Sequence, residues 1–472
     1  MLGKKTRSVV GLDIEPGFVA AAEFSNNGSP TLNRAATSEL MPGLFNEGEV
    51  TDVDGLSNQL RAFFRDNNLP KVVRLGVASQ KIVVRVIELP DIEGEQELEA
   101  AVRFQAQEEL PMPLEQAVLA HRVLEKFNDG ETARMRVLMV AARRETIEHL
   151  LTAARKAGLD PQLVDLSAFA IVRALYVPPH KVVPLDDGNG ASAQATVAPP
   201  DISPSVVDAG EHFEPIASAA QDDSQLDDVE PVGDAPEVES QPEVVPQQDF
   251  EPQPQVEQAS DVAEVLQPML DVADEATPEP EAAAAIPAEQ IFAEPVAQTE
   301  ETATLYCHVG GLTNLAIAAG TNCVFNRVLQ NGIESMVAAL AERKALTLEH
   351  ARQWLRHVGL EREVEQIEGE REIVVEARNV LVGGVSKIAD EIRLSLEYYQ
   401  GSVSNARPVD RVVLAGPAIA LAGFPARLEH EVGLTVEPRS LGAIAVSPGA
   451  LDGVDGAQLT VAAGLAIDEV VQ

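Results

Sequence analysis

The sequence predicts an internally duplicated α/β fold that carries a small α+β insertion and a long acidic linker. Residues 8–24 read SVVGLDIEPGFVAAAEF, an apolar strand, a glycine turn and a second strand. Residues 304–329, TLYCHVGGLTNLAIAAGTNCVFNRVL, repeat that order and add a third strand. Two halves that open alike indicate a duplication, and each half alternates strands with helical sequence as α/β folds do.

The first half is predicted to begin at residues 1–70 and to end at 161–178, around a small module at 71–160. The module contains strand sequence, VVRLGVASQKIVVRVIELP, followed by a helix with acids in its first turn and Pro111 at its end. Two further strands and a helix that stops at Gly158 complete it. The second half is predicted to span residues 303–472.

The segment 179–302 is predicted to be a disordered, acidic and proline-rich linker. The formal charge of the chain is −40, and residues 181–300 hold 28 acidic residues against one basic residue, together with 16 of the 31 prolines. Such a composition buries too little apolar area to offset the entropy of the chain. Residues 261–276 are interpreted either as part of this tether or as a transient docking helix. Because no basic stripe is present elsewhere, the sequence argues against nucleic acid as a partner.

Cysteine use and hydropathy exclude two further classes of protein. Cys307 and Cys323 lack metal-ligand spacing and are interpreted as small apolar strand residues in a reducing compartment. The basic N-terminus is interrupted by Asp13 and Glu15 too early for a signal peptide, and no apolar run approaches the length of a membrane span. The expectation is a soluble protein without direct membrane insertion.

The first hairpin turn has the features of a phosphate-binding loop and two features that oppose one. Asp13 ends a buried strand before the turn Pro16–Gly17, which suits a metal-bound phosphate held by backbone N–H groups. Glu15, however, adds a negative charge where the phosphate would lie, and Pro16 has no N–H to donate. The residues alone leave open whether the loop works.

Several stretches together resemble the PilM family of type IV pilus assembly proteins, which is related to the division protein FtsA. They are GLDIEPGFVAAAEF, VVRVIELPDIEGEQELEAAVRFQAQEELPMPLEQAVLAHRVLE, HVGGLTNLAIAAG, ADEIRLSLEYYQ and VVLAGPAIALAGFPARLEHEVGL, in the family's order and spacing. The resemblance covers nearly everything outside the acidic segment. It implies an actin-like ATPase (ribonuclease H-like) fold in which the small module replaces one subdomain of actin.

The resemblance also implies an ATP and magnesium site and its residues. Asp13 and Asp165 match the catalytic acids, and Asp13 would hold the magnesium through a water molecule. The residues that match the phosphate and adenosine loops are Asp13, Gly17, Gly310, Gly311, Thr313, Asn314, Gly416 and Gly423.

The chain departs from the family pattern in all three loops, and each departure is expected to weaken Mg·ATP binding. Glu15 and Pro16 stand in the first loop, His308 replaces the acid of the second, and Pro417 with Ala418 adds bulk to the third. The interpretation is therefore a degenerate nucleotide cleft. Simpler roles stay open as well: Asp13 as a turn cap, His308 as a satisfied strand-end histidine, and the glycines as turn formers.

Three functions compete. The first is a cytoplasmic scaffold, recruited to the inner face of the membrane because it binds the N-terminal segment of a PilN-like membrane protein, with other platform proteins or the motor ATPase reached indirectly. The scaffold hypothesis favours a protein without enzymatic activity. The alternative is a functional ATP-binding switch or weak ATPase that controls pilus assembly. A filament-forming division protein is a weaker third possibility, because the end LAIDEVVQ offers no amphipathic membrane helix.

Overall fold

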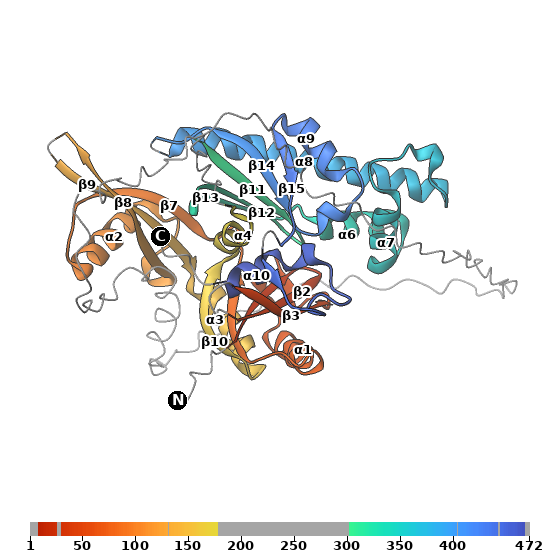
Figure 1. Ribbon diagram of the computed structural model, residues 1–472, viewed down its shortest axis with the longest axis horizontal. Coiled ribbons are helices and arrows are strands. Elements are labelled where there is room, and N and C mark those ends of the chain that lie inside the picture. Colours follow the sequence, from red (N-terminus) through yellow and green to blue (C-terminus); the bar gives the residue numbers. More distant parts are fainter. Residues whose placement is uncertain are drawn as a thin grey trace, which may run out of the picture. The chain divides into compact units, whose positions relative to one another are not determined.

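The structure is a computed structural model, and its described residues are 8–25, 30–130, 132–177, 302–403, 405–441 and 444–467. All of them belong to one of the two compact units into which the chain divides. The predicted disordered linker lies outside the described residues except for its last residue, 302, and so does the stretch 261–276, interpreted as tether or docking helix. Figure 1 shows the arrangement of the described elements.

Two sheets repeat one topology, which confirms the predicted duplication. The first sheet has the order β10-β6-β1-β2-β3-β16 and the second the order β13-β12-β11-β14-β15. In each sheet the first three strands in sequence form antiparallel hairpins, and the next two add in parallel on the other side of the opening strand. The strands of the first sheet are β1 (Val9–Glu15), β2 (Phe18–Ser25), β3 (Thr31–Glu39), β6 (Val72–Val77), β10 (Asp160–Leu166) and β16 (Ala445–Val446). Those of the second are β11 (Ala303–Val309), β12 (Thr313–Ala319), β13 (Asn322–Leu329), β14 (Val409–Ala415) and β15 (Thr435–Pro438).

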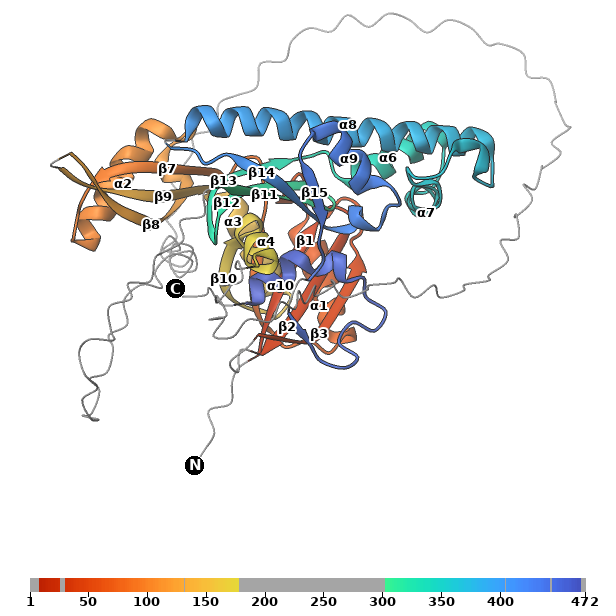
Figure 2. The same ribbon diagram turned by 45° about the horizontal axis from the view of Figure 1, so that its top comes forward.

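Amphipathic helices cover both sheets. On the first half α1 (Val53–Asp66) and α3 (Arg144–Lys156) pack together, next to the short hairpin β4 (Phe45–Asn46) and β5 (Glu49–Val50). On the second half the helices are α6 (Ile333–Lys344), α7 (Leu348–Val358), α8 (Arg371–Ser402) and α9 (Phe424–Val432). Figure 2 shows α8 running the length of the second sheet, from α7 to the neighbourhood of α2. None of the described helices combines the length and the apolar character needed to cross a bilayer.

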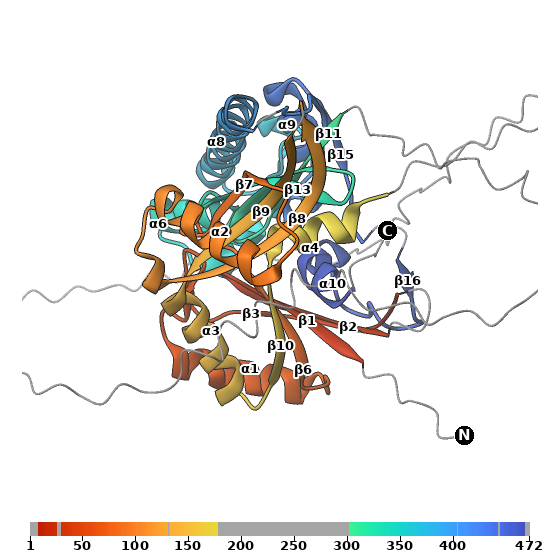
Figure 3. The same ribbon diagram turned by 90° about the vertical axis from the view of Figure 1, so that its left-hand side faces the viewer.

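Two short helices lie where the halves meet. Helix α4 (Ser167–Leu175) leaves the first sheet and packs against β12, and α10 (Thr460–Ala466) leaves the second half and packs against β1 (Figure 3). The two helices also pack on each other. Small residues allow this approach, since a Cβ on Gly464 would clash with the carbonyl of Ala170 and one on Gly11 with that of Ala462.

The small module is a three-stranded sheet with one helix. Its strands are β7 (Val83–Pro90), β8 (Ala117–Asp129) and β9 (Thr132–Arg143) in the order β7-β9-β8, and α2 (Glu95–Glu109) packs on them. Buried Val102 and Ala106 face a core of strand residues that includes Met135 and Met139. The short 3₁₀ turns in the described part of the chain are Leu114–Gln116, Val364–Gln366, Pro417–Ala420 and Gly456–Leu459.

The strand pairing places the domain boundaries at other residues than the sequence analysis expected. The module was expected at 71–160, but β6 pairs with β1, and β10 pairs with β6, so that only 83–143 lies in the small sheet. The second half was expected to run to 472, yet β16 pairs with β3 of the first sheet. The reason is pairing between distant segments, which strand composition does not encode.

Candidate functional site

The turns of the two opening hairpins contact each other. The first turn is Pro16–Gly17 and the second is Gly310–Leu312. A Cβ on Gly311 would clash with the carbonyl oxygen of Pro16, and one on Gly310 would clash with the carboxylate of Glu15. The second-turn glycines are thus required by the opposite turn, whether or not a ligand binds.

Glu15 points inward, across the junction between the halves. Its side chain is 3% exposed, and its Oε2 accepts a hydrogen bond of 2.6 Å from the N–H of Gly311. The backbone N–H of Leu312 acts on the same carboxyl group and, like that of Gly311, lowers its pKa. The switch hypothesis needs Glu15 to turn outward, and the structure has the opposite orientation.

A cluster of buried polar side chains surrounds Glu15. Asp13 and Asn314 each have side-chain atoms without a hydrogen-bond partner among the described residues, and so does His308, whose Nδ1 lies 3.7 Å from Glu15 Oε1. Burial raises the pKa of Asp13 to about 7. Burial and then the charge of Asp13 raise the pKa of Glu15 well above its usual value, while burial lowers the pKa of His308 to about 4. At neutral pH His308 is neutral, so it supplies no positive charge to balance the two acids.

Asp165 is engaged by its own half. It is the penultimate residue of β10, its Oδ1 accepts a hydrogen bond of 2.7 Å from the N–H of Leu166, and its Oδ2 pairs with Arg173 of α4. The Arg173 Nε also donates to the carbonyl of Gly464, 3.0 Å away, on α10. Asp165 and Asp13 flank Gly76 of the intervening strand, yet the ion pair gives Asp165 a role in holding α4 and α10.

The remaining expected residues separate into two groups. Gly416 lies close to His308, because a Cβ on it would stand 3.0 Å from His308 Nε2, and therefore it belongs to the buried cluster. The hydroxyl of Thr313 donates to the carbonyl of Asn331 at 2.5 Å, which fastens the second turn to the segment before α6. Gly423 caps α9 in a left-handed conformation beside the backbone of Glu361, so its role is in the local turn.

A cavity of about 600 Å³ opens beside the two turns. Gly17, Gly310 and Gly311 form part of its wall, and Pro417 and Leu421 lie on another part. Its further lining comes from α6 and α7, with both apolar and charged side chains: Ile333, Glu334, Val337, Arg352, Leu355 and Arg356. Its volume lies within the range of small-molecule sites.

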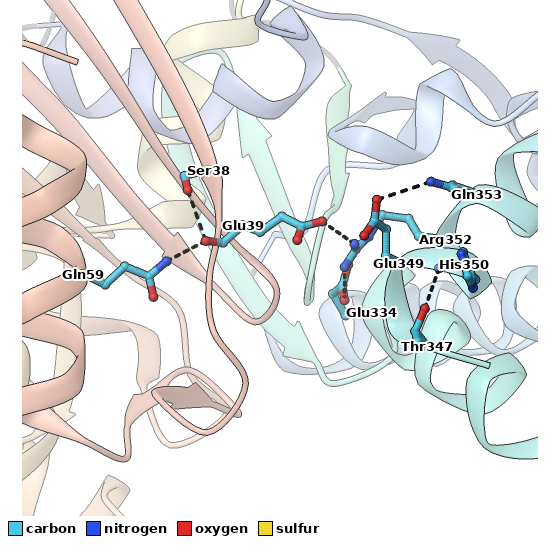
Figure 4. Close-up of polar contacts among 9 residues, drawn as sticks. All are labelled: Ser38, Glu39, Gln59, Glu334, Thr347, Glu349, His350, Arg352 and Gln353. Atoms are coloured by element: carbon cyan, nitrogen blue, oxygen red, sulfur yellow. Dashed lines mark hydrogen bonds and ion pairs between the residues drawn. The ribbon is translucent and has the colours of Figure 1, made fainter. Parts of the chain in front are cut away.

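Arg352 joins the halves across this cavity, and sequence reasoning missed it. Its Nη1 donates to Glu39 at the end of β3, 2.7 Å away, and its Nη2 donates to Glu334 of α6, 3.0 Å away (Figure 4). Glu334 in turn contacts the first turn, since a Cβ on Gly17 would clash with its side chain. The sequence around Arg352 indicates an amphipathic helix that is capped by Thr347. It does not reveal that Arg352 pairs with Glu39, which lies 313 positions away.

Comparison with known proteins agrees with the resemblance carried by the sequence motifs. Residues 11–208 match the family model described as type IV pilus assembly protein PilM. This region is a PilM-family sequence. The structure is similar to the solved PilM-PilN type IV pilus biogenesis complex, with a TM-score of 0.60 and 20% identity over 98% of both chains. The expected actin-like fold is confirmed.

Two other solved structures resemble this chain more distantly. One is the ethanolamine utilization protein EutJ from Carboxydothermus hydrogenoformans, with a TM-score of 0.41, 10% identity, and coverage of 98% of this chain and 89% of that one. The other is MreB5 of Spiroplasma citri bound to ADP, with a TM-score of 0.40, 11% identity, and coverage of 98% of this chain and 95% of that one.

Glu15 and the contact between the two turns decide how well this cleft fits the phosphates of Mg·ATP. The N–H of Gly311 in the second turn is occupied by Glu15, and the two turns are in direct contact. Glu15 would also face any phosphate with a carboxyl group at close range. Among the described residues, no group of three or more histidine, cysteine, aspartate or glutamate side chains is arranged to hold a metal ion.

Proposed function

We propose that this chain is an actin-like scaffold of the type IV pilus assembly platform with a degenerate nucleotide cleft. It binds the cytoplasmic N-terminal segment of a PilN-like membrane protein, and this partner recruits it to the inner face of the membrane. The observation that carries the proposal is the inward orientation of Glu15, which occupies the phosphate side of the cleft in a PilM-type fold. The similarity to the PilM-PilN complex supports the choice of partner.

The small module has surface features that suit a short peptide. Strand β8 is at one edge of the three-stranded sheet and has a described partner strand only on the β9 side. Edge strands and the grooves beside them accept extended peptides. On α2 the ring of Phe104 is 66% exposed, the largest exposed fraction among the large apolar side chains described. We therefore place the partner segment along this module.

The peptide hypothesis is tested by calorimetric titration of a synthetic PilN-type N-terminal peptide into the full chain. Saturable binding is expected, and Phe104→Ser should weaken it about tenfold, because an exposed aromatic anchor accounts for a large share of peptide affinity. The matched control is Met41→Ser, which changes a side chain that is 57% exposed on the loop after β3. Absence of binding to the unaltered chain would refute the scaffold.

The nucleotide half of the proposal is tested separately. Titration of Mg·ATP is expected to give no saturable heat with either the unaltered chain or Asp13→Ala. Tight binding that is abolished by Asp13→Ala would contradict the degenerate cleft and favour the alternative, an ATP-binding switch.

One observation favours that alternative. The cavity beside the turns is as large as many ligand sites, and Val337, Leu355 and Leu421 give part of its wall an apolar lining. A switch would require Glu15 to leave the second turn when nucleotide enters. Proteolysis or hydrogen exchange that changes on addition of Mg·ATP would indicate such a movement.

A further inference from the structure

The second hairpin turn is a rigid group of backbone donors. The N–H of Gly310 donates to the carbonyl of Leu312 at 2.8 Å, and the N–H of Ile333 donates to the carbonyl of Gly310 at the same distance. These bonds fix the turn to the start of α6 and leave the N–H groups of Gly311 and Leu312 directed at Glu15. Successive backbone N–H groups in such a turn form a concave site for oxyanions.

The occupant of this group of donors is part of the chain itself. Glu15 comes from β1 of the first half, and the donors come from the turn between β11 and β12 of the second half. The side chain is almost fully buried, and the turn approaches it so closely that only glycine fits at position 310. Residues of both halves therefore shape the contact between Glu15 and the turn.

We propose that the turn Gly310–Leu312 is an oxyanion site and that Glu15 is its permanent internal ligand, which holds the two halves together without a bound nucleotide. The carboxyl group takes the place that an inorganic phosphate or pyrophosphate would take. The inference rests on the degenerate-cleft half of the proposed function and adds a mechanism: the donors are intact but filled. Repulsion by the charge of Glu15 and the missing N–H of Pro16 would also weaken phosphate binding, but neither predicts intact donors that are filled by a side chain.

Two substitutions separate a filled site from a site that only repels anions. Glu15→Ala removes the carboxyl group and leaves the donors free, whereas Glu15→Gln keeps an acceptor oxygen in place without a charge. Pyrophosphate is titrated into each full-length variant and into the unaltered chain. Glu15→Ala is expected to bind pyrophosphate at least about tenfold more tightly than the unaltered chain. Glu15→Gln is expected to show no gain, because its side chain still fills the site.

The outcomes decide the inference. An equal gain in both variants would mean that charge repulsion alone had excluded the anion, and no gain in Glu15→Ala would mean that the donors do not form an oxyanion site. Either result overturns the proposal. Hydrogen exchange gives a second measurement, in which the amides of Gly311 and Leu312 should exchange faster in Glu15→Ala and stay protected in Glu15→Gln.

If Glu15→Ala fails to fold, hydrogen exchange of the unaltered chain still tests the proposal. Its Gly311 and Leu312 amides should be protected from exchange, and exchange at the rate of a free turn would refute the contact. The peptide titration is independent of these measurements. Failure of peptide binding would remove the scaffold and leave the oxyanion site, whereas failure of the pyrophosphate experiment would remove the site and leave the scaffold.

Discussion

Replacing Asp13 by asparagine should make the chain more stable above neutral pH and should alter how its stability depends on pH. Burial raises the pKa of Asp13 from its usual 3.8 to about 7. Between pH 3.8 and about pH 7, Asp13 keeps its proton in the folded chain but has lost it in the unfolded chain. The stability contributed by this proton is fully present below pH 3.8 and is lost as the pH rises through 7.

The size of the effect follows from the shift. One pKa unit corresponds to about 1.4 kcal/mol, so a shift of roughly three units lowers the free energy of unfolding by about 4 kcal/mol at pH 8. The asparagine of the variant would carry no such cost, although its unpaired amide group would offset about 1–3 kcal/mol of the gain. That offset does not depend on pH. Between pH 5 and pH 8 the difference in unfolding free energy between Asp13→Asn and the unaltered chain should therefore grow by about 3 kcal/mol.

Urea-induced unfolding followed by circular dichroism at pH 5, 6, 7 and 8 measures this difference. Glu15→Gln is the companion variant, because its carboxyl group interacts with Asp13 and its pKa is also raised. The gains of the two single variants should add to more than the gain of the double variant, since each removes part of the cost of the other. Parallel pH profiles for Asp13→Asn and the unaltered chain would show that Asp13 is not a buried, raised-pKa acid.

Three further changes have defined outcomes. Arg352→Ala should lower the free energy of unfolding by about 1–2 kcal/mol by removing the bridge across the cavity, whereas Arg356→Ala, an exposed residue on the same wall, should change it by less than about 0.5 kcal/mol. Arg173→Ala should cost about 3–5 kcal/mol in chemical unfolding, because it leaves the Asp165 charge buried without its partner. Deletion of 185–298 should leave the melting temperature nearly unchanged in calorimetry, and a large decrease would mean that this acidic stretch packs on the rest of the chain.

Local signals of the sequence predicted the elements that depend on neighbouring residues. The two opening hairpins, the helix that ends before Pro111 and the helix that stops at Gly158 all lie where turn and capping chemistry placed them. The two buried cysteines are likewise strand residues, as their surroundings indicated. In each case the residues that determine the element lie within a few positions of one another. The periodicity of apolar residues along the strand or helix therefore indicates the element directly.

Features that depend on distant residues were not predictable in the same way. The strand composition of 72–77 does not say which sheet it joins, and only its pairing with β1 assigns it to the first half. Repulsion by Glu15 was read from its charge, but its inward orientation depends on donors almost 300 positions away in sequence. Arg352 is one of two arginines in its helix, and its function is defined by Glu39 and Glu334 in space.

Two contacts join the halves beside the same cavity, and they differ in their exposure to water. The bond from Gly311 to Glu15 is buried, whereas Glu39, which accepts from Arg352, has a side chain that is 71% exposed. Salt screens exposed charges much more than buried ones. The Arg352–Glu39 contact should therefore weaken first as ionic strength rises, while the two turns stay in contact.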